Sequence, residues 1–223
     1  MKLVTVAEMQ TIEREANEKG LTYDLMMENA GCGLGNIVDI TYGHIRGKGV
    51  LGIAGSGNNG GDTLVALTYL AKHGWLARAY IARKRAVNDP LIIQLRETGA
   101  DIYLVENDPD LQILKKLVSE NSVVLDGVLG TGIKLPLLGE IAEILGVVRE
   151  LLITLPEPPV VVAVDCPSGV DCDHGHAAPE CIPAALTVTM AAVKTGLMKF
   201  PASSLTGLIP LSLIVSSTFS DFS

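Results

Sequence analysis

The stretch from Gly49 to Thr63 constrains the fold of this chain more than any other. Its first part, Val50 to Ala54, is an uninterrupted apolar run of the kind that forms a buried parallel strand. Four glycines and two asparagines follow, and a helical pattern begins near Thr63. The order of strand, polar glycine-rich loop and helix predicts an α/β domain in which this loop faces a ligand.

The glycines follow the spacing Gly55-x-Gly57-x-x-Gly60. This spacing is typical of dinucleotide-binding loops, where backbone N–H groups approach a phosphate at a helix N-terminus. A nucleotide-hydrolysing P-loop is excluded because Asp62 stands where a lysine is required. The alternative to phosphate binding is a turn that only closes the sheet, although two asparagines and an aspartate are more polar than such a turn needs.

Composition narrows the class of partner. The 223 residues suffice for one well-buried domain, and we expect residues 1–223 to form a single domain. The net charge of −8, with no basic run longer than Arg83–Arg85, argues against nucleic-acid binding. No apolar run reaches the about 18 residues of a membrane span, and the four cysteines include no CxxC pair. These features predict a cytoplasmic protein with a small-molecule partner and with neither nucleic acid nor membrane as a partner.

Short apolar runs separated by helical patterns predict a mostly parallel sheet. The expected strands are Val50–Ala54, Ala77–Ile81, Ile102–Val105, Val123–Leu125 and Val160–Val164. Two more, at Ala185–Met190 and Leu208–Val215, are expected near the end of the chain and joined through Lys194–Gly196, with an antiparallel arrangement considered for them.

Helix boundaries are marked by capping residues and glycines. A capping box at Thr5–Glu8 predicts a first helix that ends at Gly20, and a second helix begins near Thr22 or Tyr23. Further helices are expected at Leu64–His73, from Pro90 to Gly99, at Asp110–Ser119 and at Glu140–Leu152.

Polar residues follow three of the expected strands. They are Asn58–Asp62, Asp126 with Gly130–Gly132, and Asp165 with Ser168. Because parallel strands end at the same edge of a sheet, these groups are expected to lie together. The sequence therefore predicts a binding or catalytic site at that edge.

The basic triplet Arg83–Arg85 follows the expected strand Ala77–Ile81. Hydride-transferring dinucleotide enzymes usually carry an acidic residue there for the adenosine ribose. A positive charge suits an additional phosphate, or else it marks a solvated surface turn. Both interpretations weaken the case for an ordinary NAD-dependent dehydrogenase.

Five motifs make the chain resemble the YjeF N-terminal domain family, the NAD(P)H-hydrate epimerases. They are Met27–Gly31, Gly57–Asp62, Asp126 with Gly130–Gly132, Val164–Asp171 and Lys194–Leu197. Together they span nearly the whole chain, and their combination is specific. The resemblance implies a three-layer α/β/α sandwich with a Rossmann-like sheet and N-terminal helices, a homodimer, and an isomerase that interconverts the R and S forms of hydrated NADH and NADPH.

The resemblance also implies roles for individual residues. The substrate would be bound by Asn58, Asn59, Gly60, Gly61, Asp62, Gly130, Thr131, Gly132, Ile133, Lys134, Leu135, Pro136 and Asp165, the first five at a phosphate. A potassium ion would be bound by Asn59, Asp126 and Ser168. A nearby monovalent cation would offset the charge of Asp62 against the phosphate. Many bacterial relatives carry a fused dehydratase, so an NAD(P)HX dehydratase acting in the same pathway would here be a separate protein.

Three positions depart from the family pattern. Thr63 stands where glycine is usual, Gly127 where alanine is common, and Thr195 where proline often follows the lysine. None of these substitutions removes a proposed ligand.

Asp165 is the candidate catalytic acid or base because it stands at a strand end beside a Pro-Ser-Gly turn. Lys134 is the second catalytic candidate, and it would protonate the departing oxygen or orient Asp165. The alternative for Asp165 is a structural cap of its own turn. Lys194 is expected either to contact this edge or to cap a strand turn, and Cys166 is expected to be a buried thiol. A zinc site at Cys172, His174, His176 and Cys181 is disfavoured by its spacing.

Two other functions compete with the epimerase. One is a non-catalytic nucleotide- or protein-binding module, because the same fold serves in mRNA-decapping scaffolds and in an apolipoprotein-binding protein. The complete set of proposed potassium ligands, with Asp165 and Lys134, favours the enzyme, since a scaffold does not need them. The other is a Rossmann oxidoreductase, which the missing ribose carboxylate and Asp62 oppose. The choice between NADH and NADPH hydrates, and between potassium and sodium, stays open.

Overall fold

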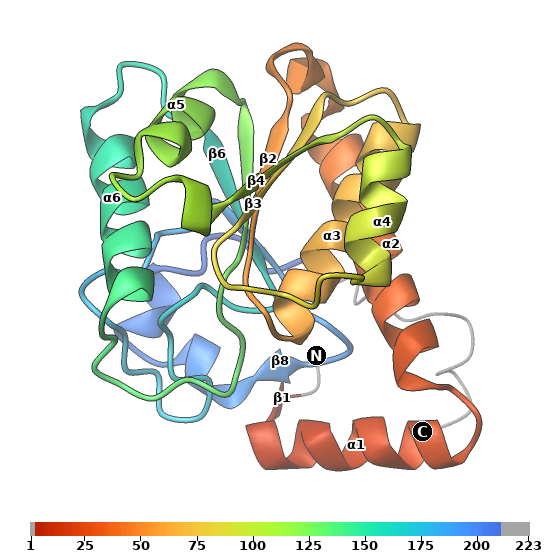
Figure 1. Cartoon of the computed structure of the whole chain (residues 1–223). Coiled ribbons are helices and arrows are strands. Elements are labelled where there is room, and N and C mark those ends of the chain that lie inside the picture. Colours follow the sequence, from red (N-terminus) through yellow and green to blue (C-terminus); the bar gives the residue numbers. More distant parts are fainter. Residues whose placement is uncertain (1–2, 211–223) are drawn as a thin grey trace.

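The centre of the protein is a six-stranded sheet with the order β4-β3-β2-β5-β6-β7, and every neighbouring pair is parallel. The computed structural model describes residues 3–210 (Figure 1). The strands of the sheet are β2 (Val50–Ala54), β3 (Ala77–Ile81), β4 (Asp101–Leu104), β5 (Val123–Gly127), β6 (Val160–Val164) and β7 (Leu186–Val188).

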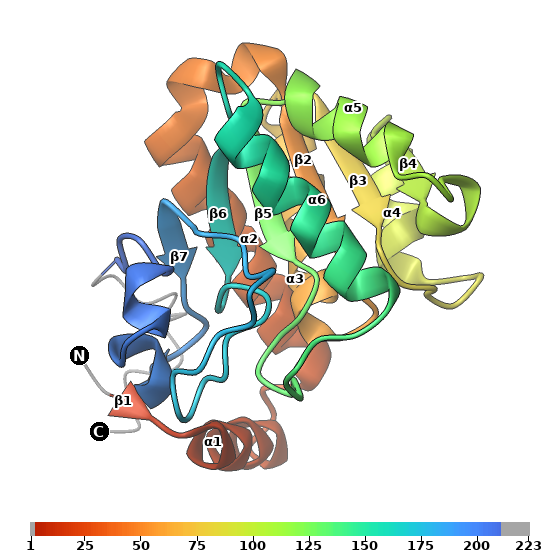
Figure 2. The same ribbon diagram turned by 90° about the vertical axis from the view of Figure 1, so that its left-hand side faces the viewer.

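Helices cover both faces of the sheet, as the two views show (Figure 1, Figure 2). One core lies between the sheet and helices α2, α3 and α4, and the other lies between the sheet and α5 and α6. Burial on both faces explains why the central strand is apolar throughout: Val50 packs into the first core and Leu51 into the second. The helices are α1 (Val6–Glu18), α2 (Tyr23–Tyr42), α3 (Asn58–Lys72), α4 (Pro90–Glu97), α5 (Gln112–Glu120) and α6 (Glu140–Thr154). The expected three-layer α/β/α sandwich is confirmed.

The strand order reverses between β2 and β5. From β2 the chain builds outward through β3 and β4, and β5, β6 and β7 then extend the sheet on the other side. In open parallel sheets such a reversal leaves a crevice at the carboxyl ends of the strands. The loops that follow β2 and β5 therefore flank the place where a ligand is expected.

Helix α3 begins earlier than the sequence pattern predicts. Its N-cap is Gly57 and its first residue is Asn58, whereas the pattern left Asn58–Asp62 in a loop and started the helix near Thr63. Glycines usually disfavour helix interiors, which is why the pattern misplaced the start. Here the packing requires a glycine, because a Cβ on Gly60 would lie 2.0 Å from the carbonyl oxygen of Gly55.

The C-terminal part of the sheet also differs from expectation. Strand β7 pairs parallel to β6, so the antiparallel arrangement is wrong. The long connection between Val164 and Leu186 leaves enough chain to return to the same end of the sheet, which a parallel pair requires. Leu208 makes only an isolated parallel bridge to Leu186, and the rest of the expected strand, residues 211–215, lies outside the described residues.

A second, two-stranded sheet was not predicted. Strand β1 (Leu3–Val4) pairs parallel to β8 (Val193–Lys194), next to the short 3-10 helix η3 (Thr195–Met198). Strands of two residues give no periodic signal, and this pair joins opposite ends of the described chain. The remaining 3-10 helices are η1 (Gly43–Lys48), η2 (Val105–Asn107) and η4 (Ala202–Ser204).

Most helix starts agree with their predicted caps. Thr5 forms the expected capping box with Glu8, and Thr22 caps α2. Helix α5 starts at Gln112 instead of Asp110, because the side chain of Asp108 accepts hydrogen bonds from the backbone of Ile113 at 3.0 Å and of Leu114 at 2.9 Å. Strand β4 begins and ends one residue before the predicted span. Within residues 3–210 no helix has the length and apolar character to cross a membrane.

Replacing Gly60 by alanine should destabilise the fold, because the new methyl group would meet the Gly55 carbonyl rather than a flexible side chain. We expect a loss of about 1–3 kcal/mol, measured by denaturant titration. The matched control is Gly146→Ala in α6, where a Cβ meets nothing within 4 Å and helix propensity should add up to about 1 kcal/mol. A Gly60→Ala variant as stable as the natural protein would contradict this account of the β2–α3 turn.

Candidate active site

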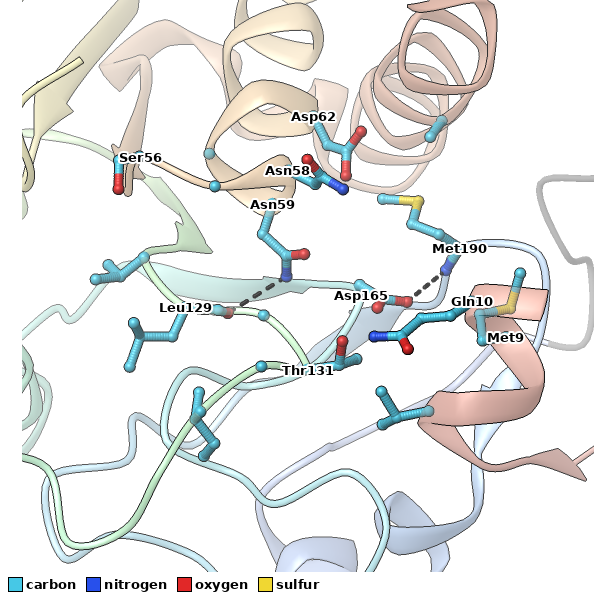
Figure 3. Close-up of a pocket in the computed structure, with 18 of the residues that line it drawn as sticks. Met9, Gln10, Ser56, Asn58, Asn59, Asp62, Leu129, Thr131, Asp165 and Met190 are labelled. Atoms are coloured by element: carbon cyan, nitrogen blue, oxygen red, sulfur yellow. Dashed lines mark hydrogen bonds between the residues drawn. The ribbon is translucent and has the colours of Figure 1, made fainter. Parts of the chain in front are cut away.

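A cavity of about 970 Å³ opens where the strand order reverses. Its wall is formed by α1, the start of α2, the start of α3, the loop after β5, the end of β6 and the loop between β7 and β8. Figure 3 shows side chains from these elements turned towards one another. The volume is at the upper end of the range of about 300–1,000 Å³ that is usual for small-molecule sites.

The start of α3 forms one side of the cavity. Asn58, Asn59, Gly60 and Asp62 line it, whereas Gly61 packs against α2, where a Cβ would lie 2.6 Å from the sulfur of Met27. No side chain caps this helix. Its first N–H groups are therefore suited to an anion such as a phosphate.

Asp62 is the most isolated charged group of the cavity. Its carboxyl is buried, and no hydrogen bond or ion pair reaches it from residues 3–210. Burial raises the pKa of Asp62 well above its usual range, Asp165 raises it further, and Lys194 opposes the shift. This shift favours the neutral form of the carboxyl, which repels a phosphate less than a carboxylate does.

Asp126 and Ser168 form a fully buried network next to the cavity rather than part of its wall. The Oγ of Ser168 donates to Oδ1 of Asp126 at 2.5 Å, and its backbone N–H donates to Oδ2 at 2.8 Å. Burial raises the pKa of Asp126, and the hydrogen bonds from Ser168 oppose the shift. Among the described side chains no cation pairs with this carboxylate.

Asn59 reaches the same region from α3. Its amide nitrogen donates to the carbonyl oxygen of Leu129 at 3.3 Å (Figure 3) and to that of Val164 at 2.5 Å. The backbone N–H of Leu129 donates to Ser168 at 2.9 Å. Of the three predicted metal ligands, Asp126 and Ser168 contact each other directly, and Asn59 is linked to Ser168 through the backbone of Leu129. A carboxylate without a cationic partner, a hydroxyl and an amide are oxygen donors that fit a hard cation.

Asp165 lines the cavity and follows β6 directly. Its backbone is left-handed, with φ +66°, which few residues other than glycine adopt. Its Oδ1 accepts a hydrogen bond from the backbone of Met190 at 2.8 Å and forms an ion pair with Lys194. The open question about Lys194 is thereby answered, because its side chain, 2% exposed, contacts the active-site edge.

The loop after β5 contributes six of the seven residues that were expected to contact the substrate. Gly130, Thr131, Gly132, Ile133, Lys134 and Pro136 line the cavity, and Leu135 does not. The side chain of Lys134 is exposed, and the cation that contacts Asp165 is Lys194. The loop approaches α3 closely, since a Cβ on Gly130 would lie 2.7 Å from the amide oxygen of Asn59.

Sequence reasoning missed the contribution of α1. Gln10 and Glu13 line the cavity, and Figure 3 shows Gln10 directed towards Thr131 and Asp165. Burial raises the pKa of Glu13, and the nearby Lys194 opposes the shift. In the sequence, both residues simply flank the apolar stripe of a short helix. That pattern does not indicate that they lie near Asp165 and Lys194, which are far away in the sequence.

The basic triplet divides into three different environments. Arg85 has a structural role, since it pairs with Asp89 at 2.7 Å and donates to the carbonyl of Gly55 at 2.8 Å. Lys84 approaches Glu106 at 3.9 Å on the surface. Arg83 is exposed and lines the cavity, so it is the one member placed to meet an additional phosphate.

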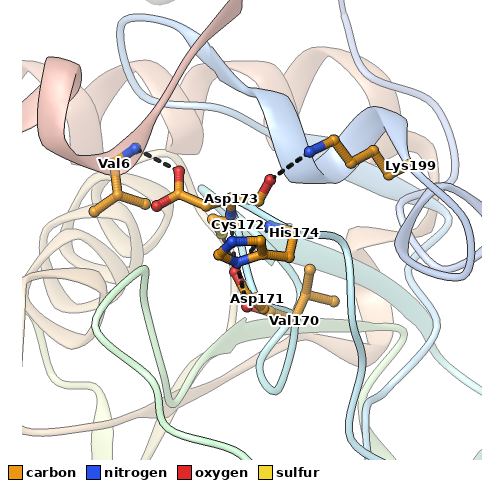
Figure 4. A network of polar contacts seen from close by, with 7 residues as sticks. All are labelled: Val6, Val170, Asp171, Cys172, Asp173, His174 and Lys199. Carbon is orange, nitrogen blue, oxygen red and sulfur yellow. Dashed lines mark hydrogen bonds and ion pairs between the residues drawn. The ribbon is translucent and has the colours of Figure 1, made fainter.

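The cysteine and histidine cluster is a structural anchor. Cys172 and Cys181 are buried, His174 is exposed, and no three His, Cys, Asp or Glu residues in the described part of the chain are grouped to hold a metal. Figure 4 shows what the loop does instead: Asp173 accepts the backbone N–H of Val6 at 2.8 Å and the amine of Lys199 at 2.8 Å. This loop therefore fastens α1 to the body of the protein. Cys166 is a buried thiol, as expected.

Comparison with known proteins shows the family to which this chain belongs. The sequence model of the family described as YjeF-related protein N-terminus matches residues 24–196, and the chain belongs to this family. The NAD(P)H-hydrate epimerase of Cenarchaeum symbiosum is 32% identical over 205 residues, which are 88% of each chain.

Two further relatives differ in extent. The bifunctional NAD(P)H-hydrate repair enzyme of Moorella thermoacetica is 31% identical over 93% of this chain, and the chain spans 39% of that relative's length. The crystal structure of yeast ynu0 superposes with a TM-score of 0.77 over 92% of this chain and 84% of the yeast chain, at 24% identity. That likeness supports the fold.

The environment of Asp62 predicts how stability depends on pH. Because its folded pKa is raised above the usual 3.8, the folded state holds a proton that the unfolded state releases, and stability falls as the pH rises above that value. Asp62→Asn keeps the shape without the charge. We therefore expect Asp62→Asn to melt at a higher temperature than the natural protein at about pH 8, and the two melting temperatures to become equal near pH 4. A variant that melts lower than the natural protein at about pH 8 but not near pH 4 would show that the Asp62 charge stabilises the fold.

Proposed function

We propose that this protein is an NAD(P)H-hydrate epimerase, which interconverts the R and S forms of hydrated NADH and NADPH. The observation that carries the proposal is that one cavity presents an uncapped helix N-terminus and a clamped carboxylate, Asp165. A hydrated dinucleotide needs both, because its phosphates are anions and its reduced ring reacts by acid–base chemistry. Membership of the YjeF-related family and similarity to proteins named NAD(P)H-hydrate epimerase support it.

The proposed reaction requires only the loss of water from one carbon of the ring and its return to the opposite face. In the hydrate, the hydroxyl is on a carbon bonded to the ring nitrogen. The nitrogen lone pair expels the hydroxyl, which leaves as water once protonated, and an iminium ion remains. Water then adds to the other face of the ring and loses a proton, which restores the hydrate with the opposite configuration.

Asp165 is the proposed acid–base group. Its clamped position beside the cavity lets it exchange a proton with the departing or returning oxygen, a contribution of about 10²–10⁴-fold. Lys134 is the proposed second proton carrier, since it is exposed on the loop that lines the cavity. The phosphates would lie on the first turn of α3, with Arg83 near enough to favour an additional phosphate.

Asn59, Asp126 and Ser168 would hold a potassium ion. The carboxylate of Asp126 lacks a cationic partner among the described residues, and the ligand types are those of a hard cation. When bound, the ion would supply positive charge behind the phosphate site.

Further properties belong to the proposal. We propose that residues 1–223 form one domain, that the protein is cytoplasmic, and that it acts as a homodimer. A dehydratase that consumes one epimer is its proposed metabolic partner, because the relative from Moorella thermoacetica is named a bifunctional repair enzyme.

The proposal is tested by a time course. Purified R-NADHX is incubated with and without the protein, in potassium and in potassium-free buffer of equal ionic strength, and the S epimer is separated chromatographically. We expect conversion above the spontaneous rate that depends on potassium. A folded protein that gives no acceleration in either buffer would overturn the proposal and favour a non-catalytic binding module.

Replacing Asp165 by asparagine should lower the rate of epimerisation by about 10²–10⁴-fold. Asparagine tolerates the left-handed backbone, so the fold should form, but the buried Lys194 loses its partner and stability should fall by about 3–5 kcal/mol. Asp110→Asn, an exposed site outside the cavity, is the matched control. An Asp165→Asn variant that retains most of its activity would remove Asp165 from the mechanism.

A further inference from the structure

The two contacts of Asp165 fall on the same oxygen. The backbone N–H of Met190 donates to Oδ1 at 2.8 Å (Figure 3). The amine of Lys194 pairs with Oδ1 as well. No contact from the described residues engages Oδ2. A carboxylate held by one oxygen from two directions has a fixed plane, and its other oxygen is available to the cavity.

Lys194 is itself held in place. Its amine also donates to the carbonyl of Met190 at 3.2 Å, so one residue of the β7–β8 loop contacts both members of the ion pair. Its backbone lies in β8, where Lys194 pairs with Val4 of β1. The backbone of Val6, which follows that strand, is fastened to Asp173 (Figure 4). The N-terminal segment therefore fixes the lysine, and the lysine fixes the aspartate.

The charges around the pair make the lysine important. Asp62 faces it from α3 and Glu13 from α1, and the thiols of Cys166 and Cys172 are its other titratable neighbours, while Lys134 is exposed on the loop after β5. Burial lowers the pKa of Lys194, but Asp165, together with Cys166 and Cys172, raises it, and the net shift is upward, so the amine stays charged. Three carboxyl groups thus face one buried cation, and only Asp165 touches it.

We propose that Lys194 is the positioning residue of the active site: together with the backbone of Met190 it holds Oδ1 of Asp165 and so turns Oδ2 towards the substrate. This inference rests on the proposed epimerase function. A purely structural lysine would stabilise the fold without affecting the turnover or the pH dependence of the folded enzyme. A positioning lysine must affect both.

The test compares Lys194→Met, which has a similar length and no charge, with Lys194→Arg, which keeps the charge. The matched control is Lys116→Met, which removes an exposed lysine of α5 that approaches Glu120 on the surface and does not line the cavity. Rates are measured on fractions shown by circular dichroism to be folded. We expect Lys194→Met to lower kcat by about 10²-fold with a much smaller change in KM, as a misplaced catalytic group does.

The pH profile gives the sharper readout. Without the lysine charge Asp165 should take up its proton at higher pH, so the acidic limb of kcat/KM should move upward in Lys194→Met. Lys194→Arg should keep the limb where the natural enzyme has it, and Lys116→Met should change neither kcat nor the limb. A folded Lys194→Met variant with unchanged kcat and an unmoved limb would overturn the inference.

A measurement without substrate separates this inference from the proposed function. Carboxyl ¹³C NMR of the free protein, with Asp165 assigned through Asp165→Asn, should show Asp165 titrating at lower pH in the natural protein than in Lys194→Met. If Lys194→Met does not fold, the comparison uses Lys194→Gln. Equal titration of Asp165 in both proteins would overturn the inference even if epimerisation is observed. Unequal titration in a protein without epimerase activity would keep the link between Lys194 and Asp165 and would overturn the proposed function instead.

Discussion

The buried hydrogen bonds between Asp126 and Ser168 are the interaction on which the rest of the site depends. They join the end of β5 to the turn after β6, and Asn59 adds the start of α3 through the carbonyl oxygens of Leu129 and Val164. Three chain segments that are far apart in sequence are thereby fixed at one edge of the sheet. A buried carboxylate is costly unless it is hydrogen-bonded or paired, and the two hydrogen bonds from Ser168 offset that cost for Asp126.

The cavity built on this edge has two chemically distinct sides. The first turn of α3 offers uncapped N–H groups for anions, and its glycines allow the helix to start against the strand-end loops. The other side carries Asp165 and Lys194, to which α1 adds Gln10 and Glu13. Helix α1 lies outside the matched residues 24–196, yet β1 and Asp173 tie it to the site. The N-terminal segment is thus part of the site rather than an appendage.

Much of this was predictable from sequence, for a physical reason. Strands buried on both faces are continuous apolar runs, so β2, β3 and β6 were predicted with their observed bounds. Parallel strands end at one edge, so the clustering of Asn59, Asp126 and Ser168 followed from their places at strand ends. The start of α3 was misplaced because packing against Gly55 overrides the low helix propensity of Gly60. Lys194 was not assigned to Asp165, and Gln10 not to the cavity, because tertiary contacts between distant segments leave no local pattern.

The central claim is that a hydrated dinucleotide lies across this cavity with its phosphates on α3 and its reduced ring at Asp165. The most direct test is a crystal structure of the protein with hydrated NADPH in potassium-containing buffer. The account predicts the pyrophosphate at the backbone of Asn58–Gly60 and the hydroxyl-bearing carbon within hydrogen-bonding reach of Oδ2 of Asp165. A ligand bound in the reverse orientation, or outside the cavity, would contradict it.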